Sequence, residues 1–190
     1  MIKILYDSQM FDKQQYGGIT RYFSNLITAL ERNSAFGVKV SVLATKNYYL
    51  SDIHKSAGSI FSGFLLSNLR RLSKWNKNYS RLCILKNDFD LFHPTYFHPY
   101  FLSILKRPFV ITVHDMIYEL YPQYFKENDR TPQHKRQLIM AARHIIAISE
   151  TTKRDLMQLL NVPAEKITVV YHGHSALLRS DKPAISLPEQ

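Results

Sequence analysis

Short apolar runs alternate with amphipathic stretches along most of the chain. Residues 2–6 are mostly apolar and end at Asp7, which predicts a first strand. Apolar residues recur at helical spacing from residue 19 to residue 30, and residues 38–43 alternate as a second strand. The order strand, glycine-containing loop, helix, strand is typical of a parallel sheet that is covered by helices.

The same two patterns continue to the end of the chain. Four more strands are expected, over residues 89–93, 109–113, 144–148 and 167–170. Helices are expected over residues 60–86, over 132–143 and after Ser149, whose side chain suits the N-cap position. We therefore expect one α/β domain over residues 1–175, a single Rossmann-like, doubly wound parallel sheet, followed by a tail or linker over residues 176–190.

Charge changes this picture more than composition does. The 190 residues include 25 Lys and Arg against 15 Asp and Glu, a net charge of +10, which favours anionic partners such as nucleic acid, phosphorylated sugars or an acidic membrane surface. Hydrophobic residues make up 45% of the chain, which argues against disorder. Cys83 has no second cysteine to pair with, and no signal peptide or membrane-spanning run is present, so secreted and integral-membrane proteins are disfavoured.

Four segments stand out in sequence order. They are residues 17–22 (GGITRY), His114-Asp115 with Pro122 and Phe125 downstream, residues 146–156 (IAISETTKRDL), and residues 162–173 (VPAEKITVVYHG). Each is a weak signal alone. Together, over about residues 2–175, they resemble the N-terminal, acceptor-side domain of the GT-B fold glycosyltransferases of family 4 (group 1). Within that family, the resemblance is to mannosyltransferases.

The resemblance implies one half of a GT-B architecture, in which two Rossmann-like domains face each other across a cleft. The C-terminal domain of such enzymes binds the nucleotide-sugar, and the N-terminal domain supplies most of the acceptor site. The chain ends at Gln190, about where that donor domain would begin, so residues 176–190 would lead toward an absent domain. We expect this chain alone to be inactive. No cofactor or metal is expected, since the GT-B fold typically needs no metal.

The glycine loop is the first candidate binding site. Gly17 and Gly18 let the backbone approach a ligand, and the helix that follows presents free N–H groups to a phosphate. The residues alone fit a tight strand-to-helix turn nearly as well. The resemblance implies a substrate-binding role beside the donor diphosphate or the acceptor phosphate. Arg21, on the first helical turn, could add charge there or lie in solvent.

His114 is the candidate catalytic residue. It follows an apolar strand, and functional residues of open α/β sheets gather at the carboxyl ends of strands. A histidine at such a place is more often structural, but the resemblance implies that His114 faces the transferred sugar. Asp115 is a candidate substrate-binding residue or a cap of the next turn. His172-Gly173 matches the interdomain crossover of the family.

Two further motifs are interpreted as accidental. Residues 88–90 (DFD) resemble the metal-binding DxD of the other large glycosyltransferase fold, but they begin a strand rather than end one. Glu119 and Glu127 have the E-x7-E spacing of the family, which normally belongs to the C-terminal domain. The closely spaced histidines lack a third ligand at zinc-like spacing, so no metal site is predicted.

The helix expected over residues 60–86 is strongly basic. Its apolar face would hold Phe61, Leu65, Leu69, Leu72, Trp75 and Tyr79, and its opposite face Arg70, Arg71, Lys74, Lys77 and Arg81. Such a helix can lie on an anionic membrane, where each basic residue contributes about 1 kcal/mol. It can equally cover the sheet with its basic face in solvent.

The sequence therefore favours the acceptor-binding domain of a retaining hexosyltransferase. It would move a hexose, with mannose the first candidate, from a nucleotide-sugar to a glycan or lipid-linked acceptor in polysaccharide biosynthesis. The expected location is cytoplasmic, with or without peripheral contact at the inner face of the membrane. The alternatives are a basic, non-enzymatic module that binds nucleic acid or phosphorylated lipid, and an inactive sugar-phosphate-binding domain. No nucleic-acid motif is present, so nucleic acid is not an expected partner.

Overall fold

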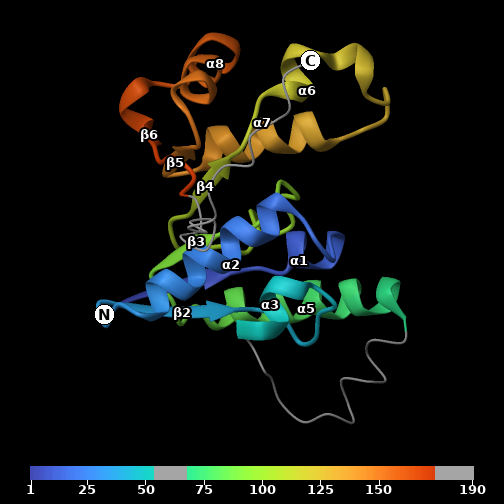
Figure 1. Ribbon diagram of the computed structural model, residues 1–190, viewed down its shortest axis with the longest axis vertical. Coiled ribbons are helices and arrows are strands. Elements are labelled where there is room, and N and C mark those ends of the chain that lie inside the picture. Colours follow the sequence, from blue (N-terminus) through green and yellow to red (C-terminus); the bar gives the residue numbers. More distant parts are fainter. Residues whose placement is uncertain (54–67, 174–190) are drawn as a thin grey trace, which may run out of the picture.

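The computed structural model describes residues 1–53 and 68–173, and it shows a parallel α/β fold (Figure 1). The strands of this part of the chain are β1 (Ile2–Tyr6), β2 (Phe36–Val40), β3 (Leu91–His93), β4 (Val110–Val113), β5 (His144–Ala147) and β6 (Ile167–Val169). They pair in the orders β2-β1-β3 and β4-β5-β6, all parallel. A parallel bridge between Phe92 and Phe109 joins the two halves, so the strand order is β2-β1-β3-β4-β5-β6.

Helices connect the successive parallel strands except β3 and β4, which are joined by turns over residues 94–109. The helices are α1 (Gln9–Lys13), α2 (Gly18–Glu31), α3 (Tyr48–Ile53), α5 (Leu69–Lys86), α6 (Ile117–Leu120), α7 (Thr131–Ala141) and α8 (Glu150–Leu160), with 3-10 turns at Pro122–Tyr124 and Ala164–Lys166. The Ser149 side chain accepts a hydrogen bond from the Thr152 backbone N–H, so the predicted N-cap of α8 is confirmed. The three short helices α1, α3 and α6 were not predicted, because fewer than two helical turns leave little periodicity in a sequence.

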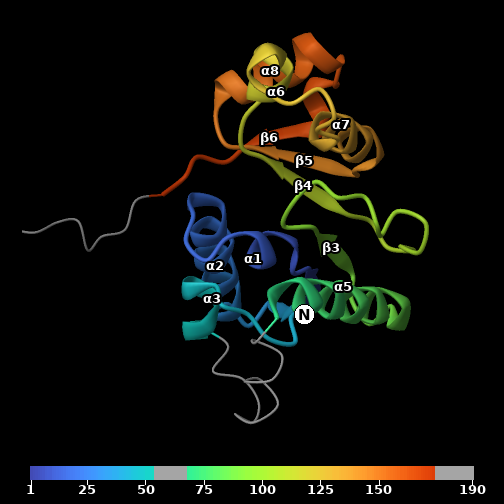
Figure 2. The ribbon, with the colours of Figure 1, turned by 90° about the vertical axis from the view of Figure 1, so that its right-hand side faces the viewer.

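Helices cover both faces of the N-terminal half of the sheet (Figures 1 and 2). Ile4 and Tyr6 of β1 pack into the apolar cluster beneath α2, together with Phe23. Leu5, between them, points to the opposite face and joins the larger cluster that includes Ile84 of α5. Since alternate residues of one strand serve two cores, the predicted doubly wound α/β fold is confirmed.

The orientation of α5 differs from the predicted one. Its first residue follows Asn68, whose side chain accepts a hydrogen bond from the Arg71 backbone, and the predicted helical residues 60–67 lie outside the described residues. Leu72 is buried as expected, but Trp75 is 43% exposed, so the predicted apolar face is wrong there. The buried face instead contains Asn76 and Ser80.

Hydrogen bonds explain why polar residues of α5 are buried. The Asn76 side chain accepts from the Leu43 backbone N–H at 2.9 Å and donates to the Ala44 carbonyl at 2.9 Å. Ser80 donates to the Ser41 carbonyl at 3.0 Å, and the Ser41 hydroxyl lies 2.8 Å from that of Ser80. These bonds hold the chain that leaves β2, so the strand ends at Val40 rather than at the predicted residue 43.

The expected tail over residues 176–190 lies outside the described residues. Within the described ranges, no helix combines the length and the apolar character needed to cross a membrane.

Candidate active site

Three polar residues lie where β1, β3 and β4 reach their carboxyl ends. Asp7 follows β1, His93 is the last residue of β3, and His114 follows β4. These strands are neighbours in the sheet, so their ends meet at one edge, where ligands of open α/β folds bind. The predicted position of His114 at this edge is confirmed.

The His114 ring is held between aromatic side chains. Its centroid lies 5.3 Å from that of Tyr22 and 6.3 Å from that of Phe23, in edge-to-face geometry. Burial, with a smaller effect of nearby His172, lowers the pKa of His114 to about 4, so the ring is neutral at pH 7. Its Nε2 atom is buried and has no hydrogen-bond partner among the described residues. A buried polar atom left unpaired in this way is available to a ligand.

Tyr22 links His114 to the end of the described chain. Its ring stacks on that of His172 at 4.9 Å, and the centroids of His114 and His172 are 5.6 Å apart. The Tyr22 hydroxyl lies 3.4 Å from the Thr112 hydroxyl. The sequence analysis gave Tyr22 no role, although it ends the GGITRY segment. Only the fold shows that this position of α2 faces the end of β4.

His93 packs against Phe23, one of the side chains that also contact His114. It is fully buried, and its Nε2 lies 2.9 Å from the Thr112 hydroxyl. Its ring contacts Tyr6 and Phe23, each at 5.2 Å between centroids. Burial lowers the pKa of His93 to about 3, so it too is neutral at pH 7. His93 is therefore a structural residue that fixes the floor of the site.

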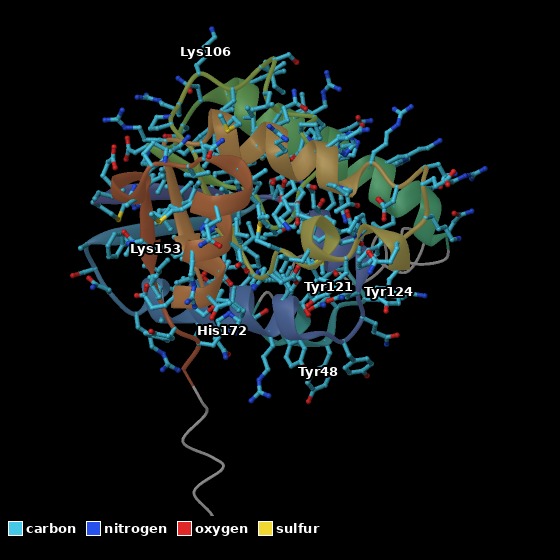
Figure 3. The ribbon with its side chains drawn as sticks, turned by 90° about the horizontal axis from the view of Figure 1, so that it is seen from above. Tyr48, Lys106, Tyr121, Tyr124, Lys153 and His172 are labelled. Atoms are coloured by element: carbon cyan, nitrogen blue, oxygen red, sulfur yellow. The ribbon has the colours of Figure 1, made fainter. Side chains whose placement is uncertain are left out.

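The α2 pocket is a hollow of about 790 Å³ beside this cluster. Its lining residues come from α2 and from the segment after β6: Gly18, Arg21, Tyr22, Asn25, Leu26, Thr28, Ala29, Arg32, Tyr171, His172 and Gly173. Figure 3 shows His172 beside α2. His114 does not line the pocket itself, but Tyr22 and His172, which both line it, contact the His114 ring.

The glycine loop divides into two roles. Gly17 is the N-cap residue of α2, and a Cβ atom there would collide with the end of the Gln14 side chain. Gly18 has open space around its Cα and lines the α2 pocket with Arg21. The structure therefore brings Gly18 and Arg21 to one surface, whereas Gly17 packs against its own loop.

Asp115 does not line the α2 pocket. Its exposed carboxylate accepts a hydrogen bond from the Ile117 backbone N–H at 3.2 Å, which is the turn-capping role considered above. Its carbonyl accepts a 2.7 Å hydrogen bond from the Nζ of Lys135. The structure thus gives Asp115 a local structural function.

A buried ion pair fixes the loop that follows His114. Lys135 is 1% exposed and pairs with Glu119 at 2.8 Å, in addition to its bond to the Asp115 carbonyl. Glu119 therefore has a structural partner, in line with the interpretation of its spacing to Glu127 as accidental. The burial of Lys135 could not be predicted from the sequence, because the next residue of the same helix, Arg136, is an exposed cation.

A network of buried carboxylates holds the first loop. Asp7 accepts hydrogen bonds from the backbone N–H and the hydroxyl of Thr95, each at 2.8 Å, and from the Tyr100 hydroxyl at 3.2 Å. Asp12 accepts from Ser8 at 2.8 Å and from Asn76 at 2.6 Å. Burial raises the pKa of both carboxyls, that of Asp12 to about 7. Through these bonds the two carboxylates hold α1 and the residues after β3 in place.

The chemistry available at the site is binding and charge stabilisation. The lining of the α2 pocket contains two arginines and no carboxylate. Nor do the described residues contain a group of three His, Cys, Asp or Glu side chains that could hold a metal. The site offers a neutral imidazole, cations and helix N–H groups, which together suit a phosphorylated sugar.

The fold is a parallel α/β domain with a candidate binding site at the carboxyl edge of its sheet, and comparisons identify its family. Residues 16–175 match the Glycosyltransferase Family 4 model, so the chain belongs to this family. The crystal structure of Anabaena Alr3699/HepE in complex with UDP is similar, with a TM-score of 0.50 and 16% sequence identity. The match covers 94% of this chain and 46% of that one, and it supports the fold of one GT-B domain. A search of curated proteins finds no match.

Proposed function

We propose that this chain is the acceptor-side domain of a retaining hexosyltransferase. It would take a hexose, with mannose the first candidate, from a nucleotide-sugar and pass it to a glycan or lipid-linked acceptor in polysaccharide biosynthesis. The observation that carries the proposal is the His114 ring at the carboxyl end of β4, with a buried and unpaired Nε2, beside the α2 pocket.

The donor would be a nucleotide-sugar held mainly by a second domain. UDP in the similar HepE structure supports a nucleotide donor, and the present chain spans about half of that protein. The isolated chain would therefore bind acceptor and not transfer sugar.

His114 would act by hydrogen bonding rather than by covalent catalysis. Because its ring is neutral at pH 7, Nε2 can donate a hydrogen bond to a hydroxyl of the transferred sugar or accept one from it, according to the tautomer of the ring. Gly18 and Arg21 would face the negatively charged part of a substrate. Positioning and electrostatic stabilisation of a leaving diphosphate account for the chemistry, with no nucleophile among the lining side chains.

The proposal is tested by joining the chain to its donor domain and measuring transfer. A panel of UDP- and GDP-hexoses with glycan and lipid-linked acceptors should give turnover with one donor, and residues 1–190 alone should give none. Absence of turnover with the whole panel, in a protein that binds nucleotide, would refute the transferase proposal.

A second surface favours peripheral membrane contact. On α5, Trp75, Leu82 and Leu85 are 43%, 58% and 59% exposed, and with Tyr79 they form one stripe along the helix. Exposed cations lie within or beside this stripe at Arg71, Lys74, Arg81 and Lys86, and α5 contains no acidic residue.

This stripe fits the surface of an anionic bilayer, with the apolar side chains inserted and the cations at the headgroups. It replaces the predicted membrane face, since Leu72 is buried in the protein. We propose that α5 holds the domain at the cytoplasmic face of a membrane, near lipid-linked acceptors.

A further inference from the structure

One face of α2 forms a long wall of the α2 pocket. Gly18, Arg21, Asn25, Thr28 and Arg32 lie three or four residues apart, so they share one side of the helix. The eleven residue-to-residue steps from Arg21 to Arg32 correspond to roughly 16 Å along a helix axis. The pocket is therefore longer than one sugar ring.

The charged side chains that line this pocket are all positive. Arg21 and Arg32 are its charged lining residues, and no carboxylate lines it. Both guanidinium groups are exposed, and neither has a hydrogen-bond or ion-pair partner among the described residues. By contrast, the buried Lys135 is satisfied by Glu119. Two unpaired arginines over a hollow without acids are suited to bidentate binding of phosphate or carboxylate.

The rest of the lining suits a carbohydrate. Asn25 and Thr28, between the two arginines, can exchange hydrogen bonds with hydroxyl groups. Tyr22 and Tyr171 supply aromatic surface. Tyr22 also contacts the His114 ring, so a group bound near Arg21 lies one side chain away from the proposed reaction centre.

From these observations we infer that the acceptor is negatively charged, and that Arg21 and Arg32 bind its phosphate or uronate groups in the α2 pocket. This inference rests on the proposed transferase function and specifies its acceptor class. The pocket would hold an extended, anionic acceptor, with one charged group at the Arg21 end and another toward Arg32.

Binding to the chain of residues 1–190 tests this directly, by calorimetry and by NMR chemical-shift mapping. The probes are inorganic pyrophosphate, tetragalacturonate and neutral maltotetraose. We expect one or both charged probes to bind, with shifts at the α2 pocket, and maltotetraose to bind at least about tenfold more weakly. Binding should weaken with salt, as the Debye length falls from about 10 Å at 0.1 M to about 3 Å at 1 M.

Variants identify the residues responsible. Arg21→Gln and Arg32→Gln should each weaken binding of the charged probe about tenfold or more. Arg136→Gln removes an equally exposed arginine of α7, outside the pocket, and should leave binding unchanged. Since these three arginines are exposed, thermal unfolding should be the same in all variants.

Several results would overturn the inference: equal binding of maltotetraose, binding of none of the probes, or charged-probe affinity that survives both pocket substitutions. Selective binding of pyrophosphate or of tetragalacturonate assigns the charge to phosphate or to uronate. If the complete enzyme transfers sugar to neutral acceptors alone, the proposed function stands and this inference fails. If charged probes bind but no donor is ever turned over, the anionic binding site stands and the proposed transferase function fails.

Discussion

The Tyr22 ring meets the His114 ring edge-on, with centroids 5.3 Å apart and planes at 87°. The Tyr22 ring also stacks on the ring of His172, at 4.9 Å. One side chain of α2 therefore joins the end of β4 to the segment after β6. This relationship makes Tyr22 a positioning residue for His114, although it touches the candidate catalytic ring only through packing.

Replacing Tyr22 should change the titration of His114. The pKa of His114 is about 4 mainly because burial disfavours the charged ring. Tyr22→Ala admits water to that ring, so the pKa should rise toward its ordinary value of about 6.5. NMR titration of the imidazole nitrogens in residues 1–190 measures this. Tyr124→Ala, which removes a tyrosine that is 79% exposed, should leave it unchanged. An unaltered His114 pKa in Tyr22→Ala would show that other groups exclude the water.

Removing His114 should affect turnover much more than folding. In the chain joined to its donor domain, His114→Ala should lower kcat by about 100-fold, the usual loss for one hydrogen-bonding group that acts in the transition state. His144→Ala is the matched control, since His144 lies at the amino end of β5, on the opposite edge of the sheet. Equal losses in both variants, or collapse of the His114→Ala fold, would make His114 a structural residue.

The sequence predicted the parallel α/β fold because apolar runs and helical periodicity are local properties. It also placed His114 correctly, since a strand's carboxyl end can be located from the strand alone. The pairing of Tyr22 with His114 and His172 could not be predicted, because these residues are brought together only by the order of the strands. Tyr171 and His172 complete the α2 pocket beside Gly18 and Arg21 for the same reason.

The orientation of α5 shows a different limit. A helical wheel sorts residues by hydrophobicity, so it placed Trp75 on the apolar face of the helix. In the structure Trp75 is 43% exposed and Asn76 is buried, because Asn76 bonds with Leu43 and Ala44, which lie at a distance in sequence. A buried polar side chain with long-range partners leaves no periodic signal.

The ion pair beside the site should be important for stability. Lys135→Met leaves the Glu119 carboxylate without its partner, so the free energy of unfolding should fall by about 3–5 kcal/mol. The double variant Lys135→Met/Glu119→Leu removes both charges and should recover much of this loss. Urea unfolding of residues 1–190 measures both. A double variant no more stable than the single one would mean that the Lys135 bond to the Asp115 carbonyl carries the effect.

Asp12 should make stability depend on pH. Its pKa is raised to about 7 by burial, so between about pH 4 and 7 the native state binds more protons than the unfolded state. This contribution to stability is present at low pH and is lost as pH rises toward 7. Asp12→Asn removes the titration, so relative to wild type it should gain about 2–3 kcal/mol on going from pH 5 to pH 8. Urea unfolding at both pH values measures this. A constant difference would mean that Asp12 is ionised throughout.

The exposed stripe of α5 should bind anionic vesicles through both charge and apolar contact. The triple reversal Arg71→Glu/Lys74→Glu/Arg81→Glu removes three flanking cations, and at about 1 kcal/mol per cation it should weaken binding at least about 100-fold. Trp75→Ser should weaken it at every salt concentration, because Trp75 is 43% exposed and would insert below the headgroups. Sedimentation with vesicles of phosphatidylglycerol and phosphatidylcholine measures both effects.

A matched control separates the α5 surface from net charge. Lys106→Glu/Arg107→Glu/Arg136→Glu makes the same change of charge at exposed positions outside α5, so a specific membrane face predicts a much smaller loss of binding. Equal losses in the two triple variants would mean that the chain's charge of +10 drives adsorption without a defined face. Displacement from vesicles by duplex DNA at equimolar charge would instead favour a nucleic-acid partner. Unchanged binding by Trp75→Ser would exclude insertion, since charge alone would then hold α5 at the headgroups.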